Sequence, residues 1–266
     1  MQDPADSESL LASDEPPAVD WRAGSIDPFF FVCEHASNRV PRALGDLGLP
    51  SEAFERHIAW DPGAAQLTLG LAERFGGAAV LQRYSRLVID CNREPELPDA
   101  ITPLSEDTPI PGNQGLGEDE RRGRIAAIWA PFHAAVDRLL NARVAARKPT
   151  ALVTIHSFTP VYRGVSRPWH VGIISTGDRR FAEPMLAALS REAGLVVGDD
   201  QPYSARDNVD YTIRRHGRER GLPHVMIEVR NDLLRTARDV SQWVERLGDA
   251  LTESAGAVGL PGPIRV

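Results

Sequence analysis

Two histidines and one glutamate each follow a short apolar run that is typical of a buried strand. His35 comes shortly after the run Phe-Phe-Phe-Val, His156 shortly after Ala-Leu-Val, and Glu228 directly after Val-Met-Ile. Ligand sites in open α/β sheets form just beyond the carboxyl ends of the strands. Imidazoles bind metal ions and carboxylates move protons. The three segments therefore predict one metallohydrolase site that is assembled from distant parts of the chain.

A catalytic zinc ion usually takes three protein ligands and one water molecule. His35 and His156 supply two, and Asp61 is a candidate for the third, although a carboxylate at a predicted helix start is normally an N-cap. Glu34 neighbours His35, but successive side chains along a strand face opposite ways. Cys33 shares the face of His35 and is interpreted as a small core residue. We predict a zinc site of His35, Asp61 and His156, with Glu34 as the alternative third ligand.

Glu228 is predicted to be the general base. A carboxylate beside a metal-activated water can take its proton and later give that proton to the leaving amine. The alternative is a structural salt bridge to one of the many arginines. The apolar run that precedes Glu228 favours a buried carboxylate with a catalytic role.

Asn92 and Arg93 follow the apolar run Leu-Val-Ile and are predicted to hold a substrate carboxylate, because a guanidinium offers a bidentate fork. Arg86 is predicted to assist. Helical spacing places Thr212 and His216 on one face, and His216 is assigned to the substrate site, with the polar end of a surface helix as the alternative. The remaining histidines are interpreted as structural: His57, His133, His170 and His224.

Apolar periodicity predicts strands that alternate with helices. The strands are expected at 29–34, 79–83, 86–91, 150–156, 169–175, 195–198 and 223–229, and the helices at 63–76, 119–147, 181–194, about 207–220 and 236–255. This alternation indicates an α/β protein, a three-layer α/β/α sandwich with a mostly parallel or mixed central sheet. Residues 95–118 contain five prolines and three glycines without periodicity. A loop this long is either a functional lid or a plain surface loop.

The composition fits a single domain with an acidic N-terminal segment. The 266 residues carry a formal charge of −7, and six of the 37 acidic side chains lie in residues 1–20. We expect residues 1–20 to be a disordered tail and residues 21–266 to form a single domain. The near-neutral remainder gives no reason to expect nucleic-acid binding, and no apolar run reaches the ~20 residues that span a bilayer.

The N-terminus lacks the basic and apolar regions of a signal peptide, and two cysteines make no disulfide framework. We therefore expect a cytoplasmic protein whose partner is a small-molecule substrate. The sequence leaves the oligomeric state open.

Six motifs, in this order, make the chain resemble the N-formylglutamate amidohydrolase family over about residues 28–252. They are Glu34–Ser37, Trp60–Ala64, Asp90–Pro95, His156–Phe158, Arg215–Gly217 and Glu228–Asp232. The resemblance implies a zinc exopeptidase-like (phosphorylase/hydrolase-like) fold and one Zn²⁺ per chain, or another divalent metal. It also implies a His–carboxylate–His ligand set, a distant catalytic Glu and an Asn-Arg pair for the substrate carboxylate.

The chain departs from this group at two positions. Carboxypeptidase-like relatives place an acidic ligand three residues after the first His, where this chain has Asn38, and this departure motivates Asp61. Formylglutamate hydrolases often read Pro-His where this chain reads Glu34-His35. The chain thus resembles a divergent branch, whose acyl group and amino acid can differ from those of the family.

The predicted reaction is zinc-dependent hydrolysis of the amide bond of an N-acyl acidic amino acid. N-formyl-L-glutamate is the example that the resemblance implies, with formate and the amino acid as products of a step in amino-acid catabolism. The alternatives are another N-acyl-amino-acid deacylase or peptidase of the same group, and a non-catalytic metabolite-binding relative.

Overall fold

A seven-stranded sheet forms the centre of the molecule. The computed structural model describes residues 9–24, 28–203 and 210–261. The strand order is β1-β3-β2-β6-β11-β9-β10, with bounds β1 Val19–Arg22, β3 Ala78–Gln82, β2 Phe29–Cys33, β6 Ala151–Phe158, β11 His224–Arg230, β9 Val171–Ile174 and β10 Val197–Asp199. The four strands from β3 to β11 run parallel, whereas β1 and β9 pair antiparallel with β3 and β11. The sheet is therefore mixed, with a parallel centre.

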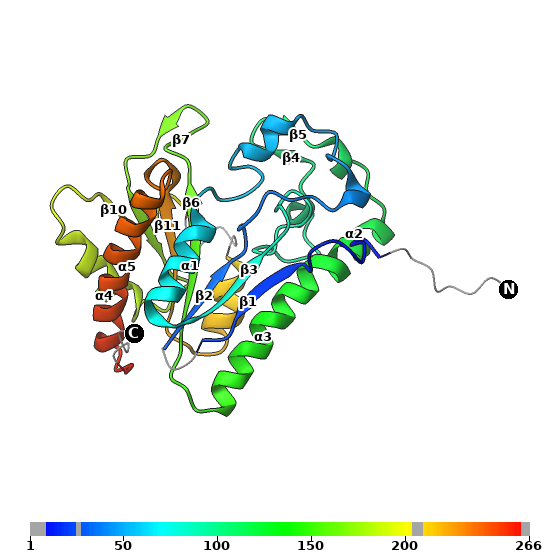
Figure 1. The fold of residues 1–266 in the computed structure, drawn as a ribbon. Coiled ribbons are helices and arrows are strands. Elements are labelled where there is room, and N and C mark those ends of the chain that lie inside the picture. The colour runs from blue at the N-terminus through cyan, green and yellow to red at the C-terminus, as the bar shows by residue number, and fades with distance from the viewer. Residues whose placement is uncertain (1–8, 25–27, 204–209, 262–266) are drawn as a thin grey trace.

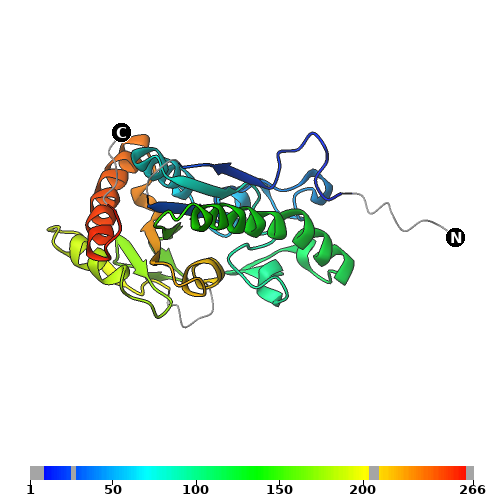
Figure 2. The ribbon, with the colours of Figure 1, turned by 90° about the horizontal axis from the view of Figure 1, so that it is seen from below.

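Helices cover both faces of this sheet, which explains why β2 is apolar at every position. Phe29, Phe31 and Cys33 face one layer of helices, α1 Ala64–Phe75, α4 Ala182–Ser190 and α5 Ala237–Ala257. Phe30 and Val32 face the other core, which contains the apolar side chains of α3 Ala130–Ala145. Figure 1 and Figure 2 show α3 along the face that α1 and α5 leave uncovered. The architecture is the predicted three-layer α/β/α sandwich.

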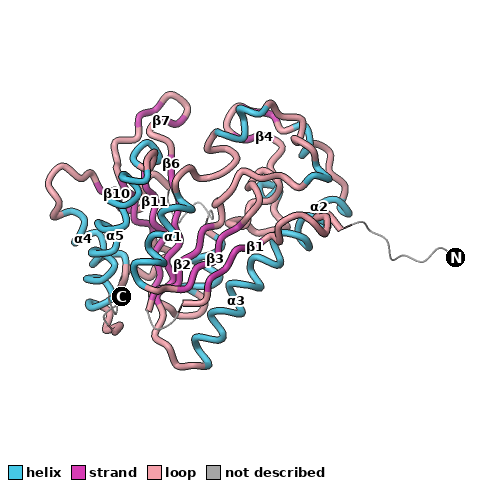
Figure 3. The backbone as a smooth tube through the Cα atoms, viewed as in Figure 1, coloured by secondary structure: helices cyan, strands magenta, loops and turns pink. Residues whose placement is uncertain are grey.

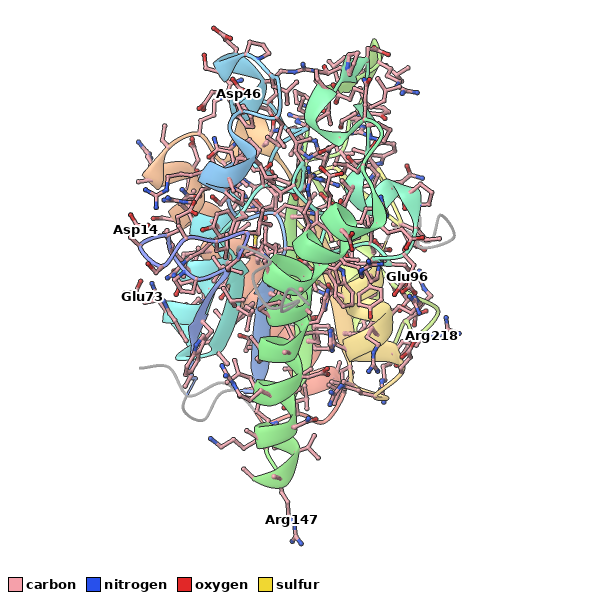
Figure 4. The ribbon with its side chains drawn as sticks, turned by 90° about the vertical axis from the view of Figure 1, so that its right-hand side faces the viewer. Asp14, Asp46, Glu73, Glu96, Arg147 and Arg218 are labelled. Atoms are coloured by element: carbon pink, nitrogen blue, oxygen red, sulfur yellow. The ribbon has the colours of Figure 1, made fainter. Side chains whose placement is uncertain are left out.

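One long helical segment occupies the predicted range 119–147. It consists of α2 Glu118–Arg124, a π-helical turn η5 Ile125–Trp129, and α3. The wide turn ends two residues before Pro131, which has no backbone N–H to continue the regular ladder of hydrogen bonds. Figure 4 shows this helix lengthwise, with Arg147 beyond its C-terminal end and Asp46 at the opposite end of the molecule.

Loops and short elements gather at the carboxyl end of the parallel strands, around β4 and β7 in Figure 3. The hairpins are β4 Leu104–Ser105 with β5 Thr108–Pro109, and β7 Val161–Tyr162 with β8 Val165–Ser166. The short helices are η1 Arg42–Leu44, η2 Ser51–Glu55, η3 Pro98–Ile101, η4 Pro111–Asn113, η7 Ile213–Arg218 and η8 Asn231–Leu233. This end is where the sequence predicts a ligand site.

The strand predicted at residues 86–91 was wrong. These residues form turns, in which Val88 N–H donates to Ser85 O at 3.0 Å and Asp90 N–H donates to Ala100 O at 2.7 Å. Leu87 and Ile89 are buried beneath the 95–113 segment. The apolar character of residues 86–91 therefore indicates burial beneath a loop and not a strand of the sheet.

The disordered tail predicted for residues 1–20 was wrong for residues 9–20. Strand β1 begins at Val19, Glu15 accepts a hydrogen bond from Arg42 N–H at 2.9 Å, and Pro16 O accepts one from the Tyr84 hydroxyl at 2.8 Å. Residues 1–8, and the first residues of the helix expected at about 207–220, lie outside the described residues. Among the described residues, no helix is both long and apolar enough to cross a bilayer.

Candidate metal and active site

Three segments bring His35, Asp61 and His156 together at the carboxyl end of the sheet. Strands β2 and β6 are parallel neighbours, with Val32 paired to Thr154, so the two histidines leave adjacent strands at the same edge. Asp61 comes from the loop before α1, and its backbone N–H donates to His35 O at 2.9 Å. This hydrogen bond fixes the Asp61 carboxylate beside the two imidazoles.

The donor atoms of these residues form a small triangle. His156 Nδ1 lies 3.2 Å from His35 Nδ1 and 3.0 Å from Asp61 Oδ2, and His35 Nδ1 lies 3.3 Å from Asp61 Oδ2. Ligands of a tetrahedral zinc ion at about 2.0–2.1 Å stand about 3.3–3.4 Å apart. All three residues are buried, and together they form a group that could hold a metal ion.

The outer nitrogen of each imidazole faces a buried carboxylate. His35 Nε2 lies 2.7 Å from Asp90 Oδ1, and His156 Nε2 lies 3.1 Å from Glu34 Oε2. A metal-ligating histidine usually donates its second N–H to such a group, which fixes the tautomer and the ring orientation. The pattern leaves both Nδ1 atoms free to bind an ion. Glu34 thus supports His156, and Asp61 occupies the third corner of the triangle.

The electrostatics of this cluster favour a positive charge. Burial opposes ionisation, but the neighbouring carboxylates of Glu34 and Asp61 hold the pKa of His156 well above its usual value. Burial likewise opposes the charge of Asp61, yet the histidines His35, His156 and His57 hold its pKa well below the usual range. A metal ion competes with the proton for the same atoms. Two imidazoles and one carboxylate match the donor set of known catalytic zinc sites.

Glu228 faces the same region from the next strand. It pairs with His156 in the register between β11 and β6, it is 4% exposed, and its Oε2 has no hydrogen-bond partner within the part of the chain that the structure describes. Burial raises the pKa of Glu228 to about 8, and the carboxylates of Asp61 and Asp210 act in the same direction. A buried carboxylate with one unpartnered oxygen and a raised pKa is typical of a proton acceptor.

A cavity of about 220 Å³ opens above these residues. Its lining includes His35, Asp61, His156, Glu228, Arg86, Asn92 and Arg93. Seven of the eight side chains that the sequence assigns to the site therefore meet in one cavity.

The two arginines of the cavity differ in their partners. Arg86 donates to Asp90 Oδ2 at 2.8 Å and lies 3.5 Å from Asp61 Oδ1. Burial opposes the charge of Arg86, but these two carboxylates hold its pKa above the usual range. Arg93 has a longer contact of 3.4 Å to the exposed carboxylate of Asp99. Arg86 therefore supports the cluster, and Arg93 is the guanidinium that remains available to a ligand.

His216 does not line the cavity. Its Nε2 lies 2.9 Å from His133 Nδ1, and its Nδ1 lies 3.2 Å from Asp137 Oδ1. Burial lowers the pKa of His216 to about 4 and that of His133 to about 3. This buried pair ties η7 to α3. The helical spacing located the correct face of η7, but it could not show that α3 covers that face.

Sequence reasoning missed several residues of the cavity wall. They are His57, Ile58, Ser105, Glu106, Tyr162, Tyr203, Asp210 and Met226. His57 was interpreted as structural, yet its Nε2 lies 3.2 Å from Asp61 Oδ1 and 2.6 Å from Ser157 O. The spacing of four residues between His57 and Asp61 was the available signal.

Two hairpins stand at the cavity mouth. Ser105 and Glu106, at the tip of the β4–β5 hairpin, contribute to the lining, as does Tyr162 of β7. Arg163 donates to Glu106 O at 3.3 Å, and Arg56 lies 3.1 Å from Glu106 Oε2. The 95–118 segment therefore forms part of the wall of the site.

The chain is similar to known proteins in sequence and in structure. The model of the N-formylglutamate amidohydrolase family matches residues 27–235. A gene product from Agrobacterium tumefaciens has a solved structure with 40% identity and a TM-score of 0.91, covering 94% of this chain and 99% of its own. N-formylglutamate amidohydrolase from Ralstonia eutropha is 16% identical with a TM-score of 0.63, covers 91% of this chain and 99% of its own, and shares the fold. No curated protein sequence matches.

The family match covers most of the chain, and the mixed sheet between two helical layers is the fold class that the sequence predicted. The chain belongs to the N-formylglutamate amidohydrolase family.

Proposed function

We propose that the protein is a zinc-dependent amidohydrolase that cleaves an N-acyl acidic amino acid, with N-formyl-L-glutamate as the first substrate to test. Membership of the family supports a hydrolase that acts on amide bonds. The observation that carries the proposal is the triangle of His35, Asp61 and His156 beside the buried carboxylate of Glu228, all in one cavity.

His35 Nδ1, His156 Nδ1 and Asp61 Oδ2 would hold the metal ion, one per chain. A bound zinc ion supplies a Lewis acid that polarises a carbonyl and lowers the pKa of water. Three protein ligands are one fewer than a closed structural zinc site has, and all three residues line the cavity, which supports a catalytic site. Asp90 and Glu34 face the Nε2 atoms of the two imidazoles and so orient the Nδ1 atoms toward the ion.

Glu228 acts as the base and then as the acid. It accepts a proton from water as the oxygen attacks the acyl carbon, and it passes that proton to the amide nitrogen as the C–N bond breaks. The products are a carboxylate, formate for an N-formyl substrate, and a free amino acid. The low exposure of Glu228 and its raised pKa support this role, since both make it a stronger base.

Arg93 and Asn92 bind the substrate carboxylate. The Asn92 side-chain oxygen accepts a hydrogen bond from Thr212 N–H at 3.1 Å, so its amide N–H₂ faces away from that contact and remains able to donate. Arg93 adds a charge-assisted hydrogen bond. Together they would fix one end of the substrate while the acyl group lies over the metal ligands.

A panel of N-acyl amino acids tests the proposal. Purified protein with zinc should release formate from N-formyl-L-glutamate, and activity should disappear with a chelator and return with zinc. N-acetyl and N-formyl derivatives of acidic, neutral and basic amino acids would then define the acyl group and side chain. A zinc-loaded protein that hydrolyses no member of the panel would contradict the proposal.

A further inference from the structure

Asp210 is a carboxylate of the cavity that the proposed reaction does not use. It is 4% exposed, it lines the cavity, and neither of its oxygens has a hydrogen-bond partner among the described residues. Burying a charged group without a partner costs several kcal/mol. A side chain kept in this state in a ligand cavity is expected to have its partner in the ligand.

The backbone places Asp210 next to the carboxylate-binding pair. Tyr211 N–H donates to Asn92 O at 3.3 Å, and Thr212 N–H donates to the Asn92 side-chain oxygen at 3.1 Å. The residue before Tyr211 is therefore held beside Asn92, and the residue after Asn92 is Arg93. The acidic side chain of Asp210 and the basic side chain of Arg93 thus line the cavity from two segments that are hydrogen-bonded to each other.

We infer that Asp210 binds the α-nitrogen of the amino acid, accepting from the amide N–H of the substrate and from the ammonium group of the product. An α-amino acid carries its carboxylate and its nitrogen on the same carbon. If Arg93 and Asn92 hold the α-carboxylate, the α-nitrogen must lie close to these two residues. Asp210 is held at the same place. The inference rests on the proposed function, because that function places an amino-acid carboxylate on Arg93.

The other acids of the cavity already have a partner or a role. Asp61 contacts His35 and His156, and Glu106 is paired with Arg56. Glu228 donates the proton that turns the nitrogen into a leaving amine. Asp210 then faces a positive charge that did not exist in the substrate, so its hydrogen bond strengthens as the C–N bond breaks.

Ligand pairs that differ only in the amine test this inference without turnover. L-Glutamate has the ammonium group and glutarate lacks it, and calorimetry gives the dissociation constant of each at neutral pH. The wild-type protein should bind L-glutamate about 10–150-fold more tightly than glutarate, the range expected for a hydrogen bond between charged groups. Asp210→Asn should bind the two ligands with nearly equal affinity.

Glu106→Gln is the matched control, because it removes one negative charge from the same cavity. It should keep the wild-type preference for L-glutamate. Thermal melting checks the fold, and Asp210→Asn should melt at the same temperature as the wild type or higher, since an unpaired buried charge is removed. A structural role for Asp210 would instead lower the melting temperature.

The outcomes separate the two claims. Equal affinities of the wild type for L-glutamate and glutarate would contradict the binding of the α-nitrogen by Asp210. So would a preference for L-glutamate that persists in Asp210→Asn. In either case, release of formate by the wild type would still support the proposed function. If the wild type bound neither ligand and released no formate, both claims would fall together.

Discussion

The carboxylate of Glu34 lies 3.1 Å from Nε2 of His156, on the side of the imidazole that faces away from the triangle of His35, Asp61 and His156. Burial opposes the ionisation of Glu34, but the nearby His156 outweighs it and keeps its pKa below the usual value. Glu34 therefore orients His156, and its neighbour in sequence, His35, contributes to the triangle itself. This relationship separates the two carboxylates that the sequence offered as third ligand.

Glu34 and Asp61 should differ in their effect on metal binding. Asp61→Asn removes a proposed ligand, whereas Glu34→Gln removes only the support of His156, and loss of such support typically costs 10–100-fold in affinity. We expect the dissociation constant for zinc to rise more in Asp61→Asn than in Glu34→Gln. A competition titration with a chromophoric chelator measures both, and the reverse ranking would make Glu34 the ligand.

Asp90 should support the metal site through His35. Its Oδ1 lies 2.7 Å from His35 Nε2, and its Oδ2 accepts from Arg86 at 2.8 Å. Asp90→Asn is expected to weaken zinc binding about 10–100-fold. Asp99→Asn is the control, since Asp99 is exposed and contacts only Arg93 among these groups. Unchanged zinc affinity in Asp90→Asn would show that His35 does not need this partner.

Arg93 should determine affinity for the substrate carboxylate. Arg93→Ala removes a charge-assisted hydrogen bond that contributes roughly 1.5–3 kcal/mol, so KM for N-formyl-L-glutamate should rise about 10–150-fold. The increase should be much smaller for an analogue whose α-carboxylate is an amide. Steady-state kinetics on both compounds provide the test, and equal losses would remove Arg93 from carboxylate binding.

The buried pair His133 and His216 should make stability depend on pH. Burial lowers the pKa of these residues to about 3 and about 4, below the ordinary value near 6.5, so both are neutral in the folded protein. The unfolded chain binds more protons between about pH 6.5 and pH 4, and the free energy of unfolding therefore falls as the pH falls through this window.

The variant His133→Gln/His216→Gln isolates this effect. When the pH falls from 6.5 to 5, the free energy of unfolding should decrease more in the wild type than in the double variant, by up to about 2 kcal/mol per histidine. Urea denaturation of the metal-free proteins at each pH measures the difference. Parallel losses in the two proteins would mean that the pair is not the source.

The sequence predicted the sheet strands and helices best where a buried segment has a clear period. The five consecutive apolar residues of β2 and the amphipathic helices α1 and α5 lie where expected, because each buries its own apolar surface. Residues 86–91 failed for a definite reason, since an apolar run buried beneath a loop looks like a strand. The order in the tail also escaped prediction, because it depends on contacts of Glu15 and Pro16 with distant residues.

The sequence could predict only those residues of the site that lie at or near the end of a predicted strand. His35, His156 and Glu228 come at or near strand ends, and these positions led directly to them. His57 lies in a segment without periodicity, and Asp210 lies near the start of the helix expected at about 207–220. The places of both side chains depend on hydrogen bonds across the fold, such as the one between Tyr211 N–H and Asn92 O. The assignment of His216 to the cavity was wrong, because helical spacing shows which residues share a face but not which element packs against that face.

The central claim is that Glu228 moves the proton in a metal-dependent hydrolysis. Glu228→Gln keeps the size and polarity of the side chain but cannot accept the proton, so kcat for formate release should fall ~10²–10⁴-fold. Zinc content and KM should remain near the wild-type values. The melting temperature should not fall, because the wild-type carboxylate is buried with an unpartnered oxygen.

The most direct measurement is therefore kcat of Glu228→Gln, determined together with zinc content and melting temperature on one preparation. The account predicts a folded, zinc-replete protein that binds substrate and releases formate ~10²–10⁴-fold more slowly than the wild type. A folded, zinc-replete Glu228→Gln protein with wild-type kcat would contradict it.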